Sequence, residues 1–306
     1  MQDPPGSAQC ILLLSGEVSF LPKTRVFEMP TCFIRPALLS QVSSRLLAIS
    51  YLFGCASYAN SQEYLNGIKW TAPAIVTPGT QNADPPSDAV VLFDGKDKSQ
   101  WKNADTWDVK DGVLICGKAQ ISTKAEFGDC QLHIEWSAPT PAVGSGQGRG
   151  NSGIFMMGKY ELQVLDSFDN LTYFDGQAGA IYKQTPPLVN AMRRPGEWNT
   201  YDIFWTGPRF KEDASLDTPA YITAVHNGAL ILNHFQLLGD TPFNRPPQYK
   251  AHPPKGPISI QDHGNPVRFR NIWIREIKPV QGVQEREPFL RDGNKETPIS
   301  KAGEKK

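Results

Sequence analysis

The chain has 306 residues, of which 40% are hydrophobic and 10% aromatic, enough apolar material for a core and too much for wholesale disorder. Thirty-one Lys and Arg residues balance thirty-one Asp and Glu residues, so no net charge is available to hold a polyanion. We therefore expect a globular protein that does not bind nucleic acid.

Residues 35–59 (RPALLSQVSSRLLAISYLFGCASYA) have a basic start, an apolar middle and small residues near their end. This order is typical of a secretory signal cleaved after Ala59, and the apolar run is too short to serve as a transmembrane anchor. We expect export to the periplasm or the extracellular space. Two alternatives stay open, namely a buried internal helix and a lipoprotein anchored at Cys55.

A signal peptide begins close to the start of the nascent chain, whereas here a long stretch stands before it. A true start at Met29 resolves this, so we assign the signal to residues 29–59. Residues 1–28 are then a misassigned start or a disordered extension.

Two segments flank the expected folded domain at residues 89–278. Residues 60–88 are rich in Pro, Gly, Thr and Asn, with no apolar period long enough for an element, which indicates a linker. Residues 279–306 are charged and nearly devoid of apolar side chains, which predicts a disordered tail.

Short β-type runs recur through the domain, bounded by Gly, Pro, Asn and Asp, and no helical period persists. This pattern predicts an all-β fold, either a sandwich or a barrel. Asn227-Gly228 between apolar runs is a strong hairpin signal. The expected strands lie within residues 90–95, 112–116, 131–136, 160–166, 201–205 and 220–232.

Five cysteines show no CxxC and no regular framework. Cys116 and Cys130 lie in the expected domain. They could form one disulfide in an exported protein, or stay as two buried free thiols.

The alternation of side chains along the strands separates polar from apolar faces. In the run that begins at Tyr160, Leu162 and Val164 share the apolar face, so Glu161 and Gln163 project together from the other face. Such a polar pair is a candidate for part of a binding site.

Two runs near the end of the domain show the same alternation. Gln261 and His263 form one polar pair, and Arg268 and Arg270 form another. If all these pairs line one concave sheet, they bring amide, imidazole, guanidinium and carboxyl groups together, which suits the hydroxyls of a sugar. The alternative is the ordinary solvated face of an antiparallel sheet.

Glycine-rich loops beside these strands carry further polar side chains. Glycine permits positive φ and a close approach of backbone to ligand, although simple turn geometry explains the same glycines. The run at residues 144–150 is not a phosphate loop, because it lacks the GK[ST] ending and no helix follows. The candidate binding residues in these loops are Arg149, Asn151, Asp166, Tyr182, Lys183 and Asn190.

Metal and nucleophile signatures are missing from the sequence. The five histidines show no HExxH or similar spacing, and no serine lies in a GxSxG elbow. We predict neither a catalytic metal nor an organic cofactor. A structural Ca²⁺ held by Asp166, Asp169 and Asp175 stays open.

Several motifs resemble the 3-keto-disaccharide hydrolase family of planctomycetes and Bacteroidetes. In chain order they are LFDGKDKSQW, RGNSGIF, YELQVLDS, GAIYKQTPP, PGEWNTYDI, HNG and ISIQDHGNPVRFRNIWIRE, from Val90 to Ile277. The resemblance implies a concanavalin A-like jelly-roll sandwich of two antiparallel sheets. It also implies cleavage of glycosides already oxidised at C3.

A ketone at C3 acidifies the C2 hydrogen, so removal of that proton expels the glycosidic oxygen by elimination, and hydration completes a net hydrolysis. This chemistry needs a base at C2, donors for the C3 oxygen and an acid for the leaving oxygen. Our first choice of base is His263 and our second is Glu161.

The remaining roles follow from residue chemistry. Arg149, Lys183 or Arg270 would stabilise the enolate oxygen, although Lys183 stands where many relatives have glycine. The residues expected to contact the sugar are Arg149, Asn151, Gln163, Asp166, Tyr182, Asn190, Gln261, Arg268 and Arg270.

The expected substrate is a 3-keto oligosaccharide or glycoside, supplied by a partner oxidoreductase that makes the ketone. The alternative is a non-catalytic, lectin-like carbohydrate-binding module on the same fold. A catalytic pocket would gather His263, Glu161 and a cation in one small volume, whereas a lectin site would be shallower and lined with aromatic rings.

Overall fold

A computed structural model describes residues 62–302 of the chain. The expected signal at residues 29–59 and the stretch before it lie outside the described residues. Within residues 62–302, no helix has the length and apolar character needed to cross a membrane.

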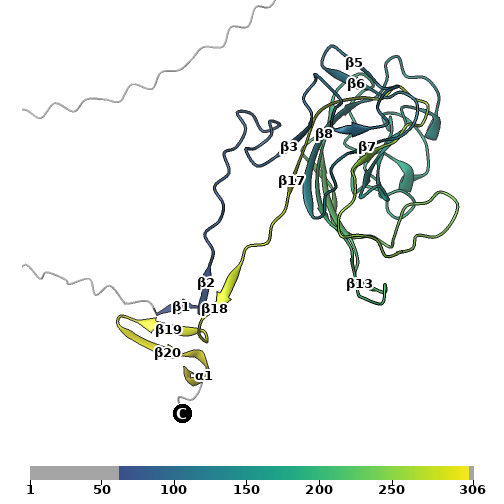
Figure 1. Ribbon diagram of the computed structural model, residues 1–306. Coiled ribbons are helices and arrows are strands. Elements are labelled where there is room, and N and C mark those ends of the chain that lie inside the picture. Colours follow the sequence, from purple (N-terminus) through teal and green to yellow (C-terminus); the bar gives the residue numbers. More distant parts are fainter. Residues whose placement is uncertain (1–61, 303–306) are drawn as a thin grey trace, which may run out of the picture. The chain divides into compact units, whose positions relative to one another are not determined.

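The domain consists of two antiparallel β-sheets (Figure 1). Strands β10 and β4 form the edges of the smaller sheet. Its order is β10 (Tyr160–Val164), β9 (Ser152–Met156), β16 (Ser259–Ile260), β7 (Ile121–Thr123) and β4 (Trp101–Lys102).

The larger sheet has eight strands, and Figure 1 shows β3, β8 and β17 running side by side within it. Strand β3 (Val90–Phe93) pairs with β17 beside the main path of the sheet. That path runs through β15 (Ala229–Gln236), β14 (Tyr221–His226), β11 (Asn199–Thr206), β8 (Cys130–Ser137), β17 (Arg268–Glu276), β6 (Val113–Ile115) and β5 (Asp108–Lys110).

The two sheets enclose one hydrophobic core, and the predicted all-β sandwich is confirmed. On β10, Leu162 and Val164 are fully buried in this core, as the alternation of side chains predicted. The hydroxyl of Tyr201 on β11 donates to the backbone carbonyl of Gln163 on β10 at 3.0 Å and so ties the sheets together. Burial of an aromatic side chain stabilises such a core by about 1.5–3 kcal/mol.

The predicted hairpin at Asn227-Gly228 is also confirmed, because β14 and β15 pair with His226 opposite Ala229. The φ angles of Asn227 and Gly228 are 51° and 83°. A two-residue hairpin loop with positive φ at both positions is the reason why Asn and Gly are favoured there. A second, shorter hairpin joins β12 (Arg209–Phe210) to β13 (Leu216–Thr218).

Both flanking segments contain strands. The prediction of a disordered tail is wrong for residues 279–302, and that of a linker without elements holds only for residues 71–88. Strand β1 (Glu63–Leu65) pairs with β19 (Phe289–Asp292), and β2 (Ile68–Trp70) pairs with β18 (Gly282–Gln284). The strands before the sandwich pair with strands after it, at the other end of the domain sequence. Local composition cannot reveal a partner so distant in the sequence. The tail continues through β20 (Lys295–Pro298) and α1 (Ile299–Ala302).

Cys116 and Cys130 are buried free thiols, which decides between the two alternatives for this pair. Burial raises the pKa of each thiol to about 12. A thiol with so high a pKa is almost never the reactive thiolate, so both side chains act as small core residues.

Candidate active site

A pocket of about 540 Å³ opens beside the edge strand β10. Polar and aromatic side chains from five separate stretches of the chain meet in it. They are Gln147, Asn151, Phe155, Glu161, Gln163, Tyr173, Tyr182, Thr241, Phe243, Gln261 and His263. Two of the three polar pairs singled out in the sequence, Glu161 with Gln163 and Gln261 with His263, therefore line one cavity.

The floor of the pocket depends on the pairing of β9 with β10. Glu161 lies opposite Phe155, and Gln163 lies opposite Gly153. A side chain at Gly153 would place its Cβ 2.2 Å from the Glu161 Oε1, so only glycine leaves room for this carboxyl group. The pairing of β9 with β10 therefore fixes the position of the Glu161 carboxyl group.

Edge strand β10 keeps its outer backbone groups occupied. The amide of Gln163 donates to Ala180 at 2.9 Å, and Gly179 donates to the carbonyl of Gln163 at 2.9 Å. The amide of Glu161 donates to the Thr241 hydroxyl at 3.0 Å. This coverage protects the edge from pairing with another chain and brings two loops to the rim of the pocket.

Glu161 is a buried acid. The residue is 4% exposed, and neither carboxyl oxygen forms a hydrogen bond with any group within residues 62–302. Burial disfavours the ionised form and raises the pKa of Glu161 to about 8. The group is therefore mostly protonated at neutral pH, which suits it to proton transfer.

Three amide side chains are packed together next to Glu161. The Gln163 Nε2 donates to the Gln147 Oε1 at 3.0 Å, and the Asn151 Nδ2 donates to the Gln147 carbonyl at 2.8 Å. This leaves the Oε1 atoms of Gln163 and Gln261 buried with no donor among the described residues. A buried acceptor without a partner is costly, so the amide groups lie here at the expense of stability.

Two tyrosines form the opposite wall, with the Tyr173 and Tyr182 hydroxyl oxygens 2.8 Å apart. A hydroxyl pair uses one of its two protons between the partners, so one proton is left for a third acceptor. Burial raises the pKa of Tyr182, which keeps its hydroxyl protonated as a donor.

His263 and Gln261 reach the pocket from the loop that follows β16. His263 is exposed at the rim, whereas Gln261 is half-buried. The backbone amide of Gln261 donates to the carbonyl of Gly153 at 2.9 Å and so anchors the loop on β9. An exposed imidazole beside a buried acid gives the pocket two different proton carriers.

The connection between β15 and β16, residues 237–258, supplies two residues that our sequence analysis missed. Thr241 is buried against β10, and Phe243 is 75% exposed at the pocket. A structureless loop of this length is unusual in a compact domain and is commonly functional, which was the available signal. Gln147, Phe155 and Tyr173 were also missed, although Gln147 lies in a loop that the sequence marked.

Lys183 does not line the pocket, in contrast to its expected catalytic role. Its φ of 60° explains why glycine suits this position. The side chain turns outward, with the Nζ 3.3 Å from the centre of the Tyr173 ring and 3.8 Å from the Asp175 Oδ1. The ammonium group therefore contacts Tyr173, whose side chain lines the pocket.

Arg149 and Asp166 also lie outside this pocket, because they pair with each other. The Arg149 Nε is 2.8 Å from the Asp166 Oδ2, and the pair lines a neighbouring hollow of about 350 Å³. Asn190 is likewise not a pocket residue, since its Nδ2 donates to the carbonyl of Ser167 at 2.9 Å. These three side chains bind protein groups that the sequence could not identify.

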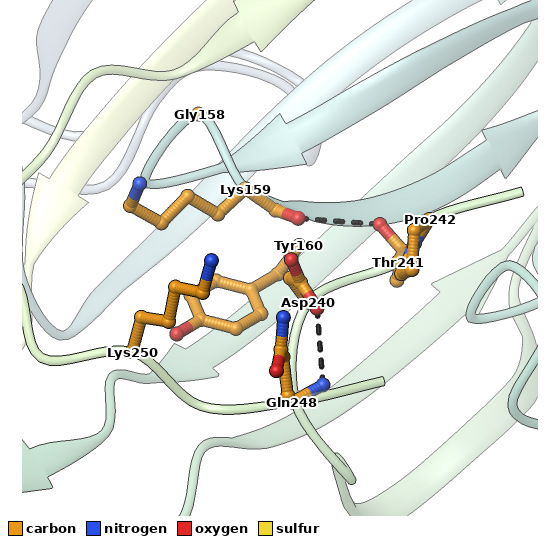
Figure 2. A pocket seen from close by; sticks show the side chains of 8 residues that line it. All are labelled: Gly158, Lys159, Tyr160, Asp240, Thr241, Pro242, Gln248 and Lys250. Carbon is orange, nitrogen blue, oxygen red and sulfur yellow. Dashed lines mark hydrogen bonds between the residues drawn. The ribbon is translucent and has the colours of Figure 1, made fainter. Parts of the chain in front are cut away.

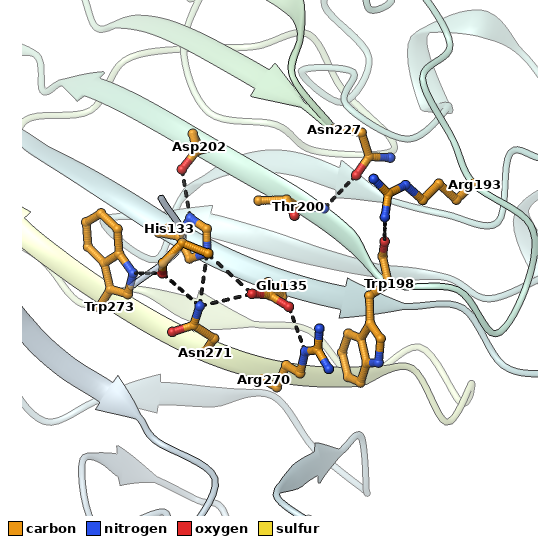
Figure 3. A network of polar contacts seen from close by, with 11 residues as sticks. His133, Glu135, Arg193, Trp198, Thr200, Asp202, Asn227, Arg270, Asn271 and Trp273 are labelled. Atoms are coloured by element: carbon orange, nitrogen blue, oxygen red, sulfur yellow. Dashed lines mark hydrogen bonds and ion pairs between the residues drawn. The ribbon is translucent and has the colours of Figure 1, made fainter. Parts of the chain in front are cut away.

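Arg268 and Arg270 belong to β17 of the larger sheet, so the third polar pair does not join the first two. The Arg270 Nε donates to the Glu135 Oε2 at 2.6 Å, and Arg268 donates to the Ser137 hydroxyl at 2.8 Å. Figure 3 shows the Arg270 guanidinium between Glu135 and Trp198. Arg270 therefore forms a salt bridge across the sheet, from β17 to Glu135 on β8.

Glu135 and His133 continue this network on the outer face of β8 (Figure 3). The His133 Nδ1 lies 2.7 Å from the Asp202 Oδ1, and the Asn271 Nδ2 donates to the Glu135 Oε1 at 2.9 Å. Burial opposes the ionisation of Glu135, but the nearby His133 ring and hydrogen bonds from Asn271 and Arg270 outweigh it and lower its pKa to about 2. The network is an ion cluster with a buried centre, His133 and Glu135, and more exposed ends at Asp202 and Arg270.

Within the described part of the chain, no group of three or more His, Cys, Asp or Glu side chains is arranged to hold a metal ion. Asp166, one of the three expected Ca²⁺ ligands, is already bound by Arg149.

Comparison with known proteins identifies relatives of this sandwich. A crystal structure from Parabacteroides distasonis, which carries the provisional description of a glycosyl hydrolase, is 52% identical, with a TM-score of 0.66, over 68% of this chain and 93% of its own. Two further structures with that description and from that organism match at 22% and 24% identity, each with a TM-score of 0.47 and over 62% of this chain. They cover 94% and 99% of their own chains.

No protein of a curated set is significantly similar to the chain. The family described as the 3-keto-alpha-glucoside-1,2-lyase-like domain, however, matches residues 88–275, which is most of the sandwich. The family predicted from the sequence motifs is thereby confirmed, and the chain belongs to the 3-keto-alpha-glucoside-1,2-lyase-like domain family.

Proposed function

We propose that the protein cleaves 3-keto-glycosides by elimination of the glycosidic oxygen followed by hydration. The observation that supports this most directly is the meeting of Glu161 and His263 with the side chains of Gln163 and Gln261 in one pocket of about 540 Å³. An elimination needs two proton carriers of different character, and a keto sugar offers hydroxyl groups to the amides.

In the first step His263 removes the proton from C2 and the electron pair forms the C2–C3 enolate. The enolate then expels the glycosidic oxygen from C1, and protonated Glu161 donates its proton to that oxygen. The products are a free alcohol and an enone with a double bond between C1 and C2. The raised pKa of Glu161, about 8, is what keeps it protonated for this role.

The negative charge on the C3 oxygen requires donors, because an unassisted enolate is a high-energy species. Tyr173 and Tyr182 together have one proton to offer to this oxygen. Lys183 lies against the Tyr173 ring, where its positive charge would stabilise negative charge that develops on the hydroxyl pair as a proton moves to the C3 oxygen. The lysine is thus a positioning residue rather than a direct contact.

In the hydration step, Glu161 acts as the base and His263 acts as the acid. Ionised Glu161 removes a proton from a water molecule, the water oxygen bonds to C1, and protonated His263 returns a proton to C2. Both residues end in their starting states, and the sum of the two steps is the hydrolysis of the glycoside.

The test is turnover of 3-keto-disaccharides by the purified full chain in D₂O. Elimination and hydration place deuterium at C2 of the released 3-keto sugar, whereas direct displacement at C1 leaves C2 unlabelled. Products without deuterium would contradict the mechanism. Unchanged substrate across several linkages, with intact saccharides bound, would favour the lectin-like alternative.

The pH dependence separates the two assignments of Glu161. If Glu161 is the acid, kcat/KM falls as pH rises through about 8, because the proton it must donate is lost. A rise through the same range would instead make Glu161 the base. His263→Ala should reduce turnover by roughly 10²–10⁴-fold, while His234→Ala, an exposed histidine on β15, serves as its matched control.

Two expectations beyond the site complete the proposal. The substrate would come from an oxidoreductase that converts the C3 hydroxyl of a sugar to a ketone. Export would place both proteins in the periplasm or outside the cell, and N-terminal sequencing of the mature protein from its host would test this by showing a chain that starts after Ala59.

A further inference from the structure

Figure 2 shows the residues that line a second hollow, of about 260 Å³. Thr241 lines both this hollow and the main pocket. Its hydroxyl accepts a hydrogen bond from the amide of Glu161 at 3.0 Å and donates one to the carbonyl of Lys159 at 3.2 Å. Successive residues on β10 therefore serve the two cavities, and a molecule that fills both would pass over Thr241.

The charges around this second hollow do not balance. Asp240 is held by the guanidinium of Arg245 and by the amide of Gln248, the latter at 3.1 Å, so its negative charge is already compensated. Lys159 and Lys250 line the hollow and form no salt bridge with any residue of the described segment. Two positive charges are left facing the cavity.

The Tyr160 ring lies between these polar groups, as Figure 2 shows. Its hydroxyl is 2.8 Å from the His252 Nε2, and the residue is 2% exposed, so the ring is fixed in place. Gln248 and Thr241 add an amide and a hydroxyl to the lining. The hollow thus offers hydrogen-bonding groups for a sugar and cations for an acidic substituent on it.

We propose that this hollow binds a sugar unit that carries an anionic group, either a carboxylate or a sulfate ester, and that this unit is the leaving group of the glycoside in the main pocket. Lys159 and Lys250 bind the anion, and Thr241 positions the linkage between the two rings. The assignment of the leaving group depends on the proposed function, whereas the binding of an anionic sugar does not.

Binding is measured first, with saccharides that cannot react. Glucose, glucuronate and glucose 6-sulfate are titrated into the full chain and followed by calorimetry. We expect at least one acidic sugar to bind more tightly than glucose, and Lys159→Gln and Lys250→Gln each to weaken it by roughly 3- to 10-fold. The comparison of glucuronate with glucose 6-sulfate shows which of the two anions is preferred.

Lys102→Gln is the matched control, because Lys102 is an exposed lysine on β4, the opposite edge of the same sheet. Equal binding of all three sugars, or an equal loss of affinity in Lys102→Gln, would overturn the proposal.

Turnover is measured second, with 3-keto-disaccharides whose leaving sugar is neutral or acidic. We expect the ratio of kcat/KM for acidic to neutral substrates to exceed one and to fall in the Lys159 and Lys250 variants but not in Lys102→Gln. Failure to cleave any keto-disaccharide, with selective binding of acidic sugars intact, would refute the proposed function and leave this site standing. Cleavage that does not depend on the two lysines would support the proposed function and refute the assignment of the leaving sugar to this hollow.

Discussion

Replacing Glu161 with glutamine should make the protein more stable at alkaline pH, although it removes the proposed acid. In the folded protein this carboxyl group has a pKa of about 8, against an ordinary value of 4.5. The folded state therefore holds its proton more tightly than the unfolded state does. As pH rises from 4.5 to about 8, Glu161 loses its proton in the unfolded state but keeps it in the folded state. The free energy of unfolding therefore falls steadily over this range.

The size of this effect follows from the two pKa values. Each tenfold difference in proton affinity corresponds to about 1.4 kcal/mol, so the destabilisation grows by about 4 kcal/mol between pH 5 and pH 9. The glutamine of the variant would be neutral throughout and would escape this cost. It would add a penalty of about 1–3 kcal/mol for an unsatisfied buried amide, but that penalty does not vary with pH.

The measurement is the free energy of unfolding of both proteins by urea at pH 5, 7 and 9. The free energy of unfolding of the variant minus that of the wild type should increase from pH 5 to pH 7 and again to pH 9. Effects of pH on other groups are common to both proteins and cancel in this difference. Glu212→Gln, at an exposed position between β12 and β13, is the matched control and should show no such trend. A difference that stays constant with pH, or that moves towards the wild type, would refute the reasoning.

Three further predictions test the packing around the site. Gly153→Ala should displace the Glu161 carboxyl, since the added Cβ would lie 2.2 Å from the Oε1, and should lower kcat roughly 10- to 100-fold with little change in secondary structure by circular dichroism. Tyr182→Phe removes a hydroxyl from the pair at 2.8 Å and should lower kcat by about 10²-fold with a small change in KM, which steady-state kinetics would check. Glu135→Gln leaves Arg270 without its carboxylate, so thermal unfolding at pH 7 should show a loss of about 1–3 kcal/mol, and this loss should shrink as pH falls towards 2.

The fold could be predicted from the sequence because its signals are local. Alternation along the run at Tyr160 identified which side chains face the core, and Asn227-Gly228 identified a hairpin through the φ angles it requires. The same alternation paired Glu161 with Gln163, and these two side chains do line the pocket.

What the sequence could not decide was which sheet each strand joins. Gln261 and Arg268 are only seven residues apart, yet β16 and β17 lie in different sheets, so the amide reaches the pocket and the guanidinium reaches Ser137. Lys183 was assigned to the pocket from its chemistry, but its ammonium group packs on the Tyr173 ring and does not line the pocket.

Tertiary structure also decided the chemical state of the site. Glu161 is an ordinary acid in the sequence, and only enclosure by β9 and the two loops raises its pKa to about 8. Side-chain alternation is a property of neighbouring residues and can be read along the chain. Desolvation and charge pairing depend on groups that are distant in sequence, and these become neighbours only when the two sheets and their loops close around one another.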